Sequence, residues 1–158
     1  MKTGYFTGKG WLSPILYKRP WWRVWTRTWW EWRTDKTNPS TFHHPDGRRF
    51  RPHGYMARTD LGSIPQAIQS LPSFGPTDFP YSYVMHDSAY EDGGLYTCIP
   101  EHDTDDYRFT PMTRNEIDQL LYLCVQAEGA HRVARSLIYT AVHRFGWIIW
   151  NKHKHRSK

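Results

Sequence analysis

The chain has 158 residues, which suits one modest hydrophobic core and is too short for two. No apolar run approaches the roughly 20 residues that span a bilayer, the opening MKTGYFTGKG lacks the apolar segment of a secretory signal, and two cysteines exclude a disulfide framework. The formal charge of +6 favours an acidic partner such as nucleic acid or an anionic membrane surface. We therefore expect a soluble protein that is made in the cytoplasm and is not exported by a signal of its own.

Residues 1–20 contain scattered glycine and proline with little periodicity, which predicts an extended N-terminal arm or short strands. Tryptophan then concentrates sharply, with six of the nine residues inside positions 21–32. The stretch 21–33 is also rich in valine and threonine, which favours a strand. Because side chains alternate along a strand, one face is a ladder of rings and cations. Its members are Trp21, Arg23, Trp25, Arg27 and Trp29.

The opposite face of this strand, which includes Trp30 and Trp32, is predicted to be the core face. A helix would also place Trp22, Trp25, Trp29 and Trp32 on one stripe, so both assignments stay open. Next, residues 34–47 carry the proline, asparagine and Asp-Gly signals of a loop. Residues 48–59 are interpreted as an irregular strand that pairs back with the tryptophan segment. The pattern predicts a β-hairpin with a long loop.

The second half of the chain predicts helices. Residues 81–90 fit a helix of about ten residues that ends at Gly93 and Gly94, and a polar loop containing residues 101–106 follows. Thr113 and Glu116 have the spacing of a capping box that begins a second helix, and Gly129 is placed to end it.

The last predicted helix covers residues 131–150, and a basic tail occupies residues 151–158. Its predicted core stripe consists of Val133, Leu137, Ile138, Ala141, Val142, Phe145, Ile148 and Ile149. Together these elements predict an α+β fold, with an N-terminal aromatic-rich β-hairpin region followed by about three helices. The predicted organisation is an arm over residues 1–20, a single domain over residues 21–150 and the tail.

Candidate chemistry lies in three short elements that include Asp60, the pair His86 and Asp87, and Asp118. Asp118 falls at the edge of an apolar helical stripe, where a carboxylate needs a partner. His86 is one candidate, and such a pair would hold the imidazole in one tautomer as a general base for water. Tyr90 lies one turn after His86 on the same face. Asp87 and Asp60 would supply oxygen ligands to Ca²⁺ or Mg²⁺.

A purely structural interpretation explains the same residues. Asp118 would pair with Arg114 one turn earlier, a contact worth a few tenths of a kcal/mol. His86 and Asp87 would be a satisfied polar pair at a helix edge, and Asp60 would cap a short segment.

Four motifs occur in order along the chain: TDLGSIP, MHDSAY, TRNEID and YTAVHRFGWIIW. Their order and spacing over residues 48–150 resemble an uncharacterised family common in bacteriophages and prophages. This resemblance implies a phage origin and does not by itself imply a mechanism.

The HD-x-x-Y motif is more distantly similar to phospholipases of the A2 class, including the domain of parvovirus capsid proteins. The resemblance implies His86 as base, Asp87 as calcium ligand, Asp118 as the carboxylate that orients the histidine, and Tyr90 as support. Those enzymes surround calcium with carbonyls of a glycine-rich loop, whereas TDLGSIP has one glycine and offers the Asp60 side chain.

Two main functions follow as expectations. The first is calcium-assisted hydrolysis of an ester, with phospholipid as the substrate class. The second is a non-catalytic virion or assembly component that uses the Trp/Arg face against other virion subunits. An anionic membrane surface and nucleic acid are further expected partners of that face.

Overall fold

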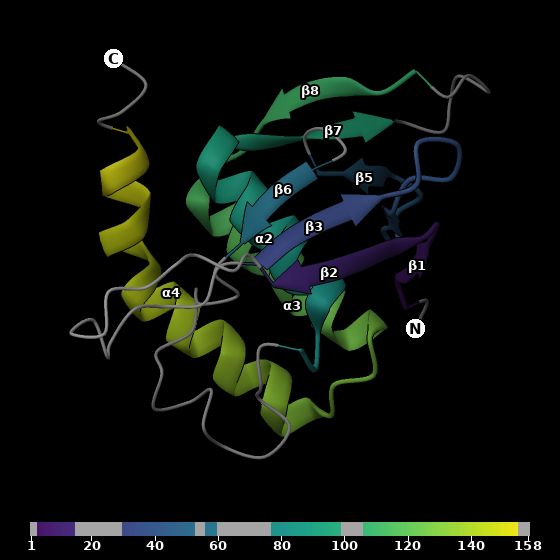
Figure 1. Ribbon diagram of the computed structural model, residues 1–158. Helices are drawn as coiled ribbons and strands as arrows, with labels where there is room; N and C mark the ends of the chain where they lie inside the picture. The colour runs from purple at the N-terminus through teal and green to yellow at the C-terminus, as the bar shows by residue number, and fades with distance from the viewer. Residues whose placement is uncertain (1–2, 15–29, 53–55, 60–76, 99–105, 155–158) are drawn as a thin grey trace, which may run out of the picture.

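The computed structural model describes residues 3–14, 30–52, 56–59, 77–98 and 106–154, and every structural statement below concerns these residues. They form eight strands and three helices (Figure 1). The strands are β1 (Tyr5–Thr7), β2 (Gly10–Pro14), β3 (Trp30–Thr34), β4 (Thr41–His43), β5 (Arg49–Arg51), β6 (Met56–Thr59), β7 (Gly94–Cys98) and β8 (Arg108–Pro111). The helices are α2 (Pro80–Asp92), α3 (Arg114–Ala127) and α4 (Arg132–Lys154). This arrangement confirms the α+β prediction.

The strands form two antiparallel sheets. One has the order β1-β4-β5-β7-β8 and the other has the order β2-β3-β6. In the smaller sheet Trp32 lies opposite Leu12 on one neighbour and Ala57 on the other, and its side chain is buried. The tryptophan segment is therefore a strand over Trp30–Thr34, and Trp32 lies on the core face as predicted. Trp21, Arg23, Trp25, Arg27 and Trp29 lie outside the described residues.

The predicted hairpin is only partly right, because residues 48–59 contribute to both sheets. β6 pairs with β3 as expected, whereas β5 pairs with β4 and β7 in the other sheet. Pro52 follows β5 directly and has no N–H for a ladder hydrogen bond, so the strand stops there. The predicted loop 34–47 also contains β4, and the turn that joins β4 to β5 holds Gly47 at φ 98°.

A second hairpin, β7 and β8, lies between α2 and α3, where the sequence pattern indicated only a loop. β8 is exposed along its length and is the edge strand among the described strands, so it lacks the alternation that marks a half-buried strand. Gly94 permits the close pairing, since a Cβ there would lie 2.3 Å from the Thr110 carbonyl oxygen.

Helix α2 confirms the prediction for residues 81–90. It begins at Pro80, which suits a first-turn position that needs no N–H bond, and ends at Gly93, whose φ of 73° is left-handed. Most of its side chains are buried, because it contacts α3, α4, β6 and β7. The Glu128 carboxylate accepts from the backbone N–H groups of Tyr81 (3.2 Å) and Ser82 (2.7 Å) at the first turn. Helix α2 therefore forms the centre of the domain.

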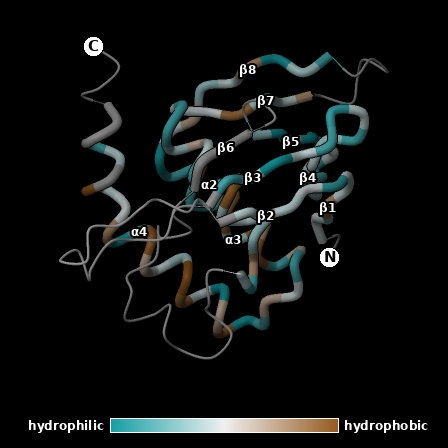
Figure 2. Tube along the Cα trace, in the orientation of Figure 1, coloured by the Kyte–Doolittle hydropathy of each residue, from teal (hydrophilic) through white to brown (hydrophobic). Residues whose placement is uncertain are grey.

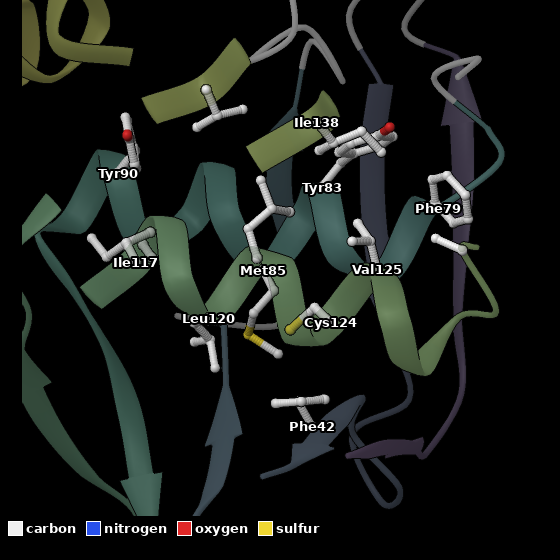
Figure 3. Packing of buried hydrophobic residues seen from close by; sticks show 14 of the residues in the cluster. Phe42, Phe79, Tyr83, Met85, Tyr90, Ile117, Leu120, Cys124, Val125 and Ile138 are labelled. Carbon is white, nitrogen blue, oxygen red and sulfur yellow. The ribbon is translucent and has the colours of Figure 1, made fainter. Parts of the chain in front are cut away.

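Helix α3 begins with the predicted capping box. The Thr113 hydroxyl accepts from the Glu116 N–H (3.3 Å), and the Glu116 carboxylate accepts from the Thr113 N–H (2.7 Å). Gly129 follows the helix at φ 94°. Figure 3 shows Leu120 and Cys124 of α3 between Phe42 of β4 and Ile138 of α4, so the two central helices fill the space between sheet and α4. Both cysteines are buried and unbridged.

The predicted core stripe of α4 is wrong for half of its residues. Ile138, Ala141 and Val142 are buried as expected, together with Ala134. The exposed members of the predicted stripe are Val133, Leu137, Phe145 and Ile148. Helix α4 is apolar on more than one side, so periodicity alone does not identify the side that faces α2 and α3. Small residues such as Ala134 and Ala141 occupy the contact, because they allow close helix packing.

Thr113→Ala is expected to lower the free energy of unfolding by about 1 kcal/mol, because it removes the side chain that caps α3. Urea denaturation followed by circular dichroism measures the loss. Thr140→Ala, at an exposed position of α4, is the control and should be neutral or slightly stabilising. Equal changes in the two variants would contradict a role for the capping box.

Candidate functional site

The Asp118 carboxylate is the point where the three helices meet. Asp118 lies on the buried face of α3, and its side chain has no exposed surface. Tyr90 Oη donates to Oδ1 at 2.5 Å, and His86 Nε2 lies 3.4 Å from the same oxygen. His143 Nδ1 of α4 lies 3.3 Å from Oδ2, and Arg114 Nη1 lies 3.9 Å from it. We call these five residues the Asp118 cluster.

The two nitrogens of the His86 ring differ in their surroundings. Nε2 faces Asp118, and an ionised carboxylate only accepts, so the hydrogen-bond network assigns a proton to Nε2. Nδ1 is buried, has no hydrogen-bond partner among the described residues and lies 3.7 Å from Asp87 Oδ1. The side chain of His86 has no exposed surface. Nδ1 is therefore the ring atom free to gain or lose a proton.

Tyr90 connects the pair to α4. Its ring packs on the His86 ring with centroids 4.2 Å apart, and Trp150 packs edge-on against it at 5.3 Å. A Cβ at position 146 would lie 2.6 Å from the Tyr90 hydroxyl oxygen, so Gly146 is needed for α4 to approach this closely. Figure 3 shows the Tyr90 hydroxyl directed toward α4. Gly146 of the motif YTAVHRFGWIIW thus allows α4 to contact the residues of the motifs MHDSAY and TRNEID.

The electrostatics of the cluster favour an ion pair. Burial lowers the pKa of His86, but the hydrogen bond to Asp118 and the negative charges of Asp87 and Asp118 outweigh burial, so the pKa is raised. Burial raises the pKa of Asp118, but hydrogen bonds from His86 and Tyr90 and the charges of His86 and Arg114 bring it below its usual value. Burial and Asp118 raise the pKa of Tyr90, which keeps its hydroxyl a donor.

His143 and Arg114 form the edge of the cluster that reaches solvent, with side chains 42% and 25% exposed. Arg114 Nη1 also donates to the His143 carbonyl oxygen at 2.9 Å, which joins α3 to α4. Sequence reasoning considered Arg114 only as a structural partner and did not identify His143. The signal for His143 was its place inside the motif YTAVHRFG, but nothing in the spacing indicated which helix it faces.

The structure brings together three of the residues proposed from sequence, His86, Tyr90 and Asp118, and places Asp87 beside them. The alternative pairing of Asp118 with Arg114 is present as its longest contact, not as its main one. Asp60 lies outside the described residues, although it follows directly on β6, which contacts α2.

Calcium binds six to eight oxygen ligands, and Asp87 is the one proposed ligand that the structure describes. Within the described ranges, His, Cys, Asp and Glu side chains form no group of three that could hold a metal ion. The described residues therefore do not by themselves make a calcium site.

Asp118→Asn is expected to lower the free energy of unfolding by roughly 3–5 kcal/mol, because it removes one partner of a buried ionic pair. Because folding raises the pKa of His86, protonated His86 stabilises the fold below pH 6.5. This contribution is lost as the pH rises through the folded pKa. Because folding lowers the pKa of Asp118, ionised Asp118 stabilises the fold above pH 3.8. This contribution is lost as the pH falls through the folded pKa. The difference between wild type and variant should therefore be largest between these two values.

Urea titrations across this pH range, in the presence of a chelator, test this expectation. Asp106→Asn is the matched control, because Asp106 pairs with Arg108 at an exposed position, where removal costs about 1 kcal/mol or less. A loss in Asp118→Asn that does not change with pH would contradict the ion pair.

The chain matches a family model described as "Protein of unknown function (DUF1353)" over residues 37–142. The matched region begins before β4, includes His86, Tyr90, Arg114 and Asp118, and ends within α4 one residue before His143. No curated protein and no solved structure matches the chain significantly. Because the family model covers more than half of the sequence, the chain belongs to the DUF1353 family.

Proposed function

We propose that this protein is a phage-encoded hydrolase of carboxylic esters, with phospholipid as the substrate class and His86 as the general base. The observation that carries the proposal is the His86–Asp118 pair, in which Nε2 faces a buried carboxylate and no hydrogen bond to Nδ1 comes from the described part of the chain. A histidine held in one tautomer by a carboxylate, with a second nitrogen that can take a proton when the ring is neutral, has the arrangement that general-base catalysis requires.

Each residue has a stated role in the proposed reaction. Asp118 accepts a hydrogen bond from Nε2–H and so orients the ring, and the Tyr90 hydroxyl holds Asp118 in place. Neutral His86 takes a proton at Nδ1 from water, whose oxygen adds to the ester carbonyl carbon. The tetrahedral intermediate then collapses, the bond to the alcohol oxygen breaks, and the Nδ1 proton passes to the departing alkoxide. The products are one carboxylic acid and one alcohol.

For this reaction, water has to reach the buried ring of His86. The His86 side chain has no exposed surface, and its Nδ1 lies on the Asp87 side of the ring. Water must therefore reach Nδ1 by displacement of chain segments next to Asp87. The edge formed by Arg114 and His143 lies on the opposite side of Asp118, at the second carboxylate oxygen.

Calcium is the proposed cofactor, with Asp87 and Asp60 as its protein ligands. When bound, it would stabilise negative charge that develops on the substrate oxygen. Since the described residues include only one of these ligands, the roles given above to His86, Asp118 and Tyr90 involve no metal.

A non-catalytic role as a virion or assembly component is the second candidate, and the burial of the His86 side chain is the observation that favours it. In that case the Asp118 cluster fixes the three helices, and the Trp/Arg face of residues 21–29 contacts other virion subunits. The protein would be made in the host cytoplasm and incorporated into the virion. No described helix has the length and apolarity required to cross a membrane.

The test is release of fatty acid from mixed phospholipid vesicles and from a soluble short-chain ester, each with and without calcium. Wild type should hydrolyse the vesicle lipid, and His86→Ala should lower the rate by roughly 10²–10⁴-fold, the usual contribution of a general base. Tyr90→Phe should reduce the rate less, because the ring remains. His43→Ala, in β4 and half-buried, is the control and should retain activity.

Circular dichroism and unfolding midpoints establish that each variant is folded. Folded wild type that releases no fatty acid in any condition, or folded His86→Ala as active as wild type, would refute the hydrolase proposal. The role as a virion component predicts that folded wild type releases no fatty acid and that the protein is present in purified virions.

A further inference from the structure

Helix α4 exposes an unusual number of large apolar side chains. Five residues of this helix are 43–63% exposed: Val133, Leu137, Phe145, Trp147 and Ile148. At 100° per residue, all of these except Phe145 lie within an arc of about 100° on the helix. Figure 1 shows α4 at the outside of the molecule, away from the sheets, and Figure 2 shows hydrophobic positions distributed along it. We call these five residues the α4 apolar face.

The charge of the chain is concentrated in the same region. Residues 129–158 contain seven of the 21 Lys and Arg residues and none of the 15 Asp and Glu residues. The other 128 residues therefore contain fourteen basic and fifteen acidic residues, and their net charge is −1. Arg132 and Arg144 of α4 are exposed, and Arg144 lies at the angular centre of the α4 apolar face. The positive net charge belongs to the C-terminal helix and tail.

This combination fits an anionic lipid surface better than other partners. Interfacial helices carry Trp, Phe and Leu together with Lys and Arg. Two copies of α4 would repel each other, because each contains five Lys and Arg residues and no Asp or Glu residue. Nucleic acid binding uses aromatic rings that stack on bases, whereas Val133, Leu137 and Ile148 are aliphatic and have no π-face.

We propose that α4 docks the protein onto anionic membrane surfaces. The α4 apolar face enters the boundary between headgroups and acyl chains, and Arg132 and Arg144 contact lipid phosphates. His143 precedes Arg144 on the same helix, so docking brings the solvent-exposed edge of the Asp118 cluster close to the lipid. The docking itself does not depend on hydrolysis and goes beyond the proposed function.

The experiment is flotation of the full chain with vesicles of phosphatidylcholine alone and of phosphatidylcholine with phosphatidylglycerol, in the presence of a chelator. Wild type should float with the anionic vesicles and remain largely unbound with the neutral ones. The double substitution Leu137→Glu and Ile148→Glu should weaken binding roughly tenfold or more, because two apolar side chains leave the lipid. Phe109→Glu, at an equally exposed apolar position of β8, should bind like wild type.

A second variant tests the charges. Arg132→Ser with Arg144→Ser should weaken binding to anionic vesicles and leave binding to neutral vesicles unchanged, and high salt should reproduce this effect in wild type. Circular dichroism confirms that each variant is folded. Failure of wild type to float, binding of Leu137→Glu/Ile148→Glu equal to Phe109→Glu, or retention on duplex DNA without flotation would overturn the proposal. Flotation without fatty acid release would support docking and refute hydrolysis, so the two outcomes are distinguishable.

Discussion

The structure depends on one buried carboxylate. An ionised aspartate without exposed surface is costly unless donors surround it, and Asp118 obtains them from all three described helices. Tyr90 and His86 reach it from α2, His143 reaches it from α4, and Arg114 lies beside it on α3. These contacts fix the relative positions of the helices more specifically than apolar packing does, because each bond has a preferred distance and direction.

The same contacts place opposing demands on His86. As part of the fold, the ring is most favourable when protonated between Asp118 and Asp87, which is why its pKa is raised. As a general base, the ring must be neutral at Nδ1 and reachable by water. A cation bound to Asp87, or movement of the Asp87 carboxylate away from His86, would make neutral His86 more favourable. Either change would remove one of the two negative charges that favour the imidazolium.

Helix α4 faces two environments at once. Its inner side presents small residues such as Ala134 and Ala141 to α2 and α3, and Gly146 lets it reach Tyr90. Its outer side presents large apolar residues among arginines, which is not the composition of an ordinary solvated helix face. A helix that carries part of a polar cluster inside and an apolar, basic surface outside is well placed to link the cluster to a surface on which the protein docks.

The sequence by itself determined the three helices, the caps of α2 and α3, and His86, Tyr90 and Asp118 of the Asp118 cluster. Gly93, Gly129 and the Thr113–Glu116 capping box are local signals, because they depend on backbone conformation and on hydrogen bonds between near neighbours. Apolar spacing around Asp118 was enough to indicate a carboxylate that needs a partner. Only the tertiary structure decided which partners it has, that β5 and β6 enter different sheets, and which apolar side of α4 is buried. Strands of three to five residues carry too little periodicity to specify their neighbours, and a helix that is apolar on two sides is oriented only by the elements that pack against it.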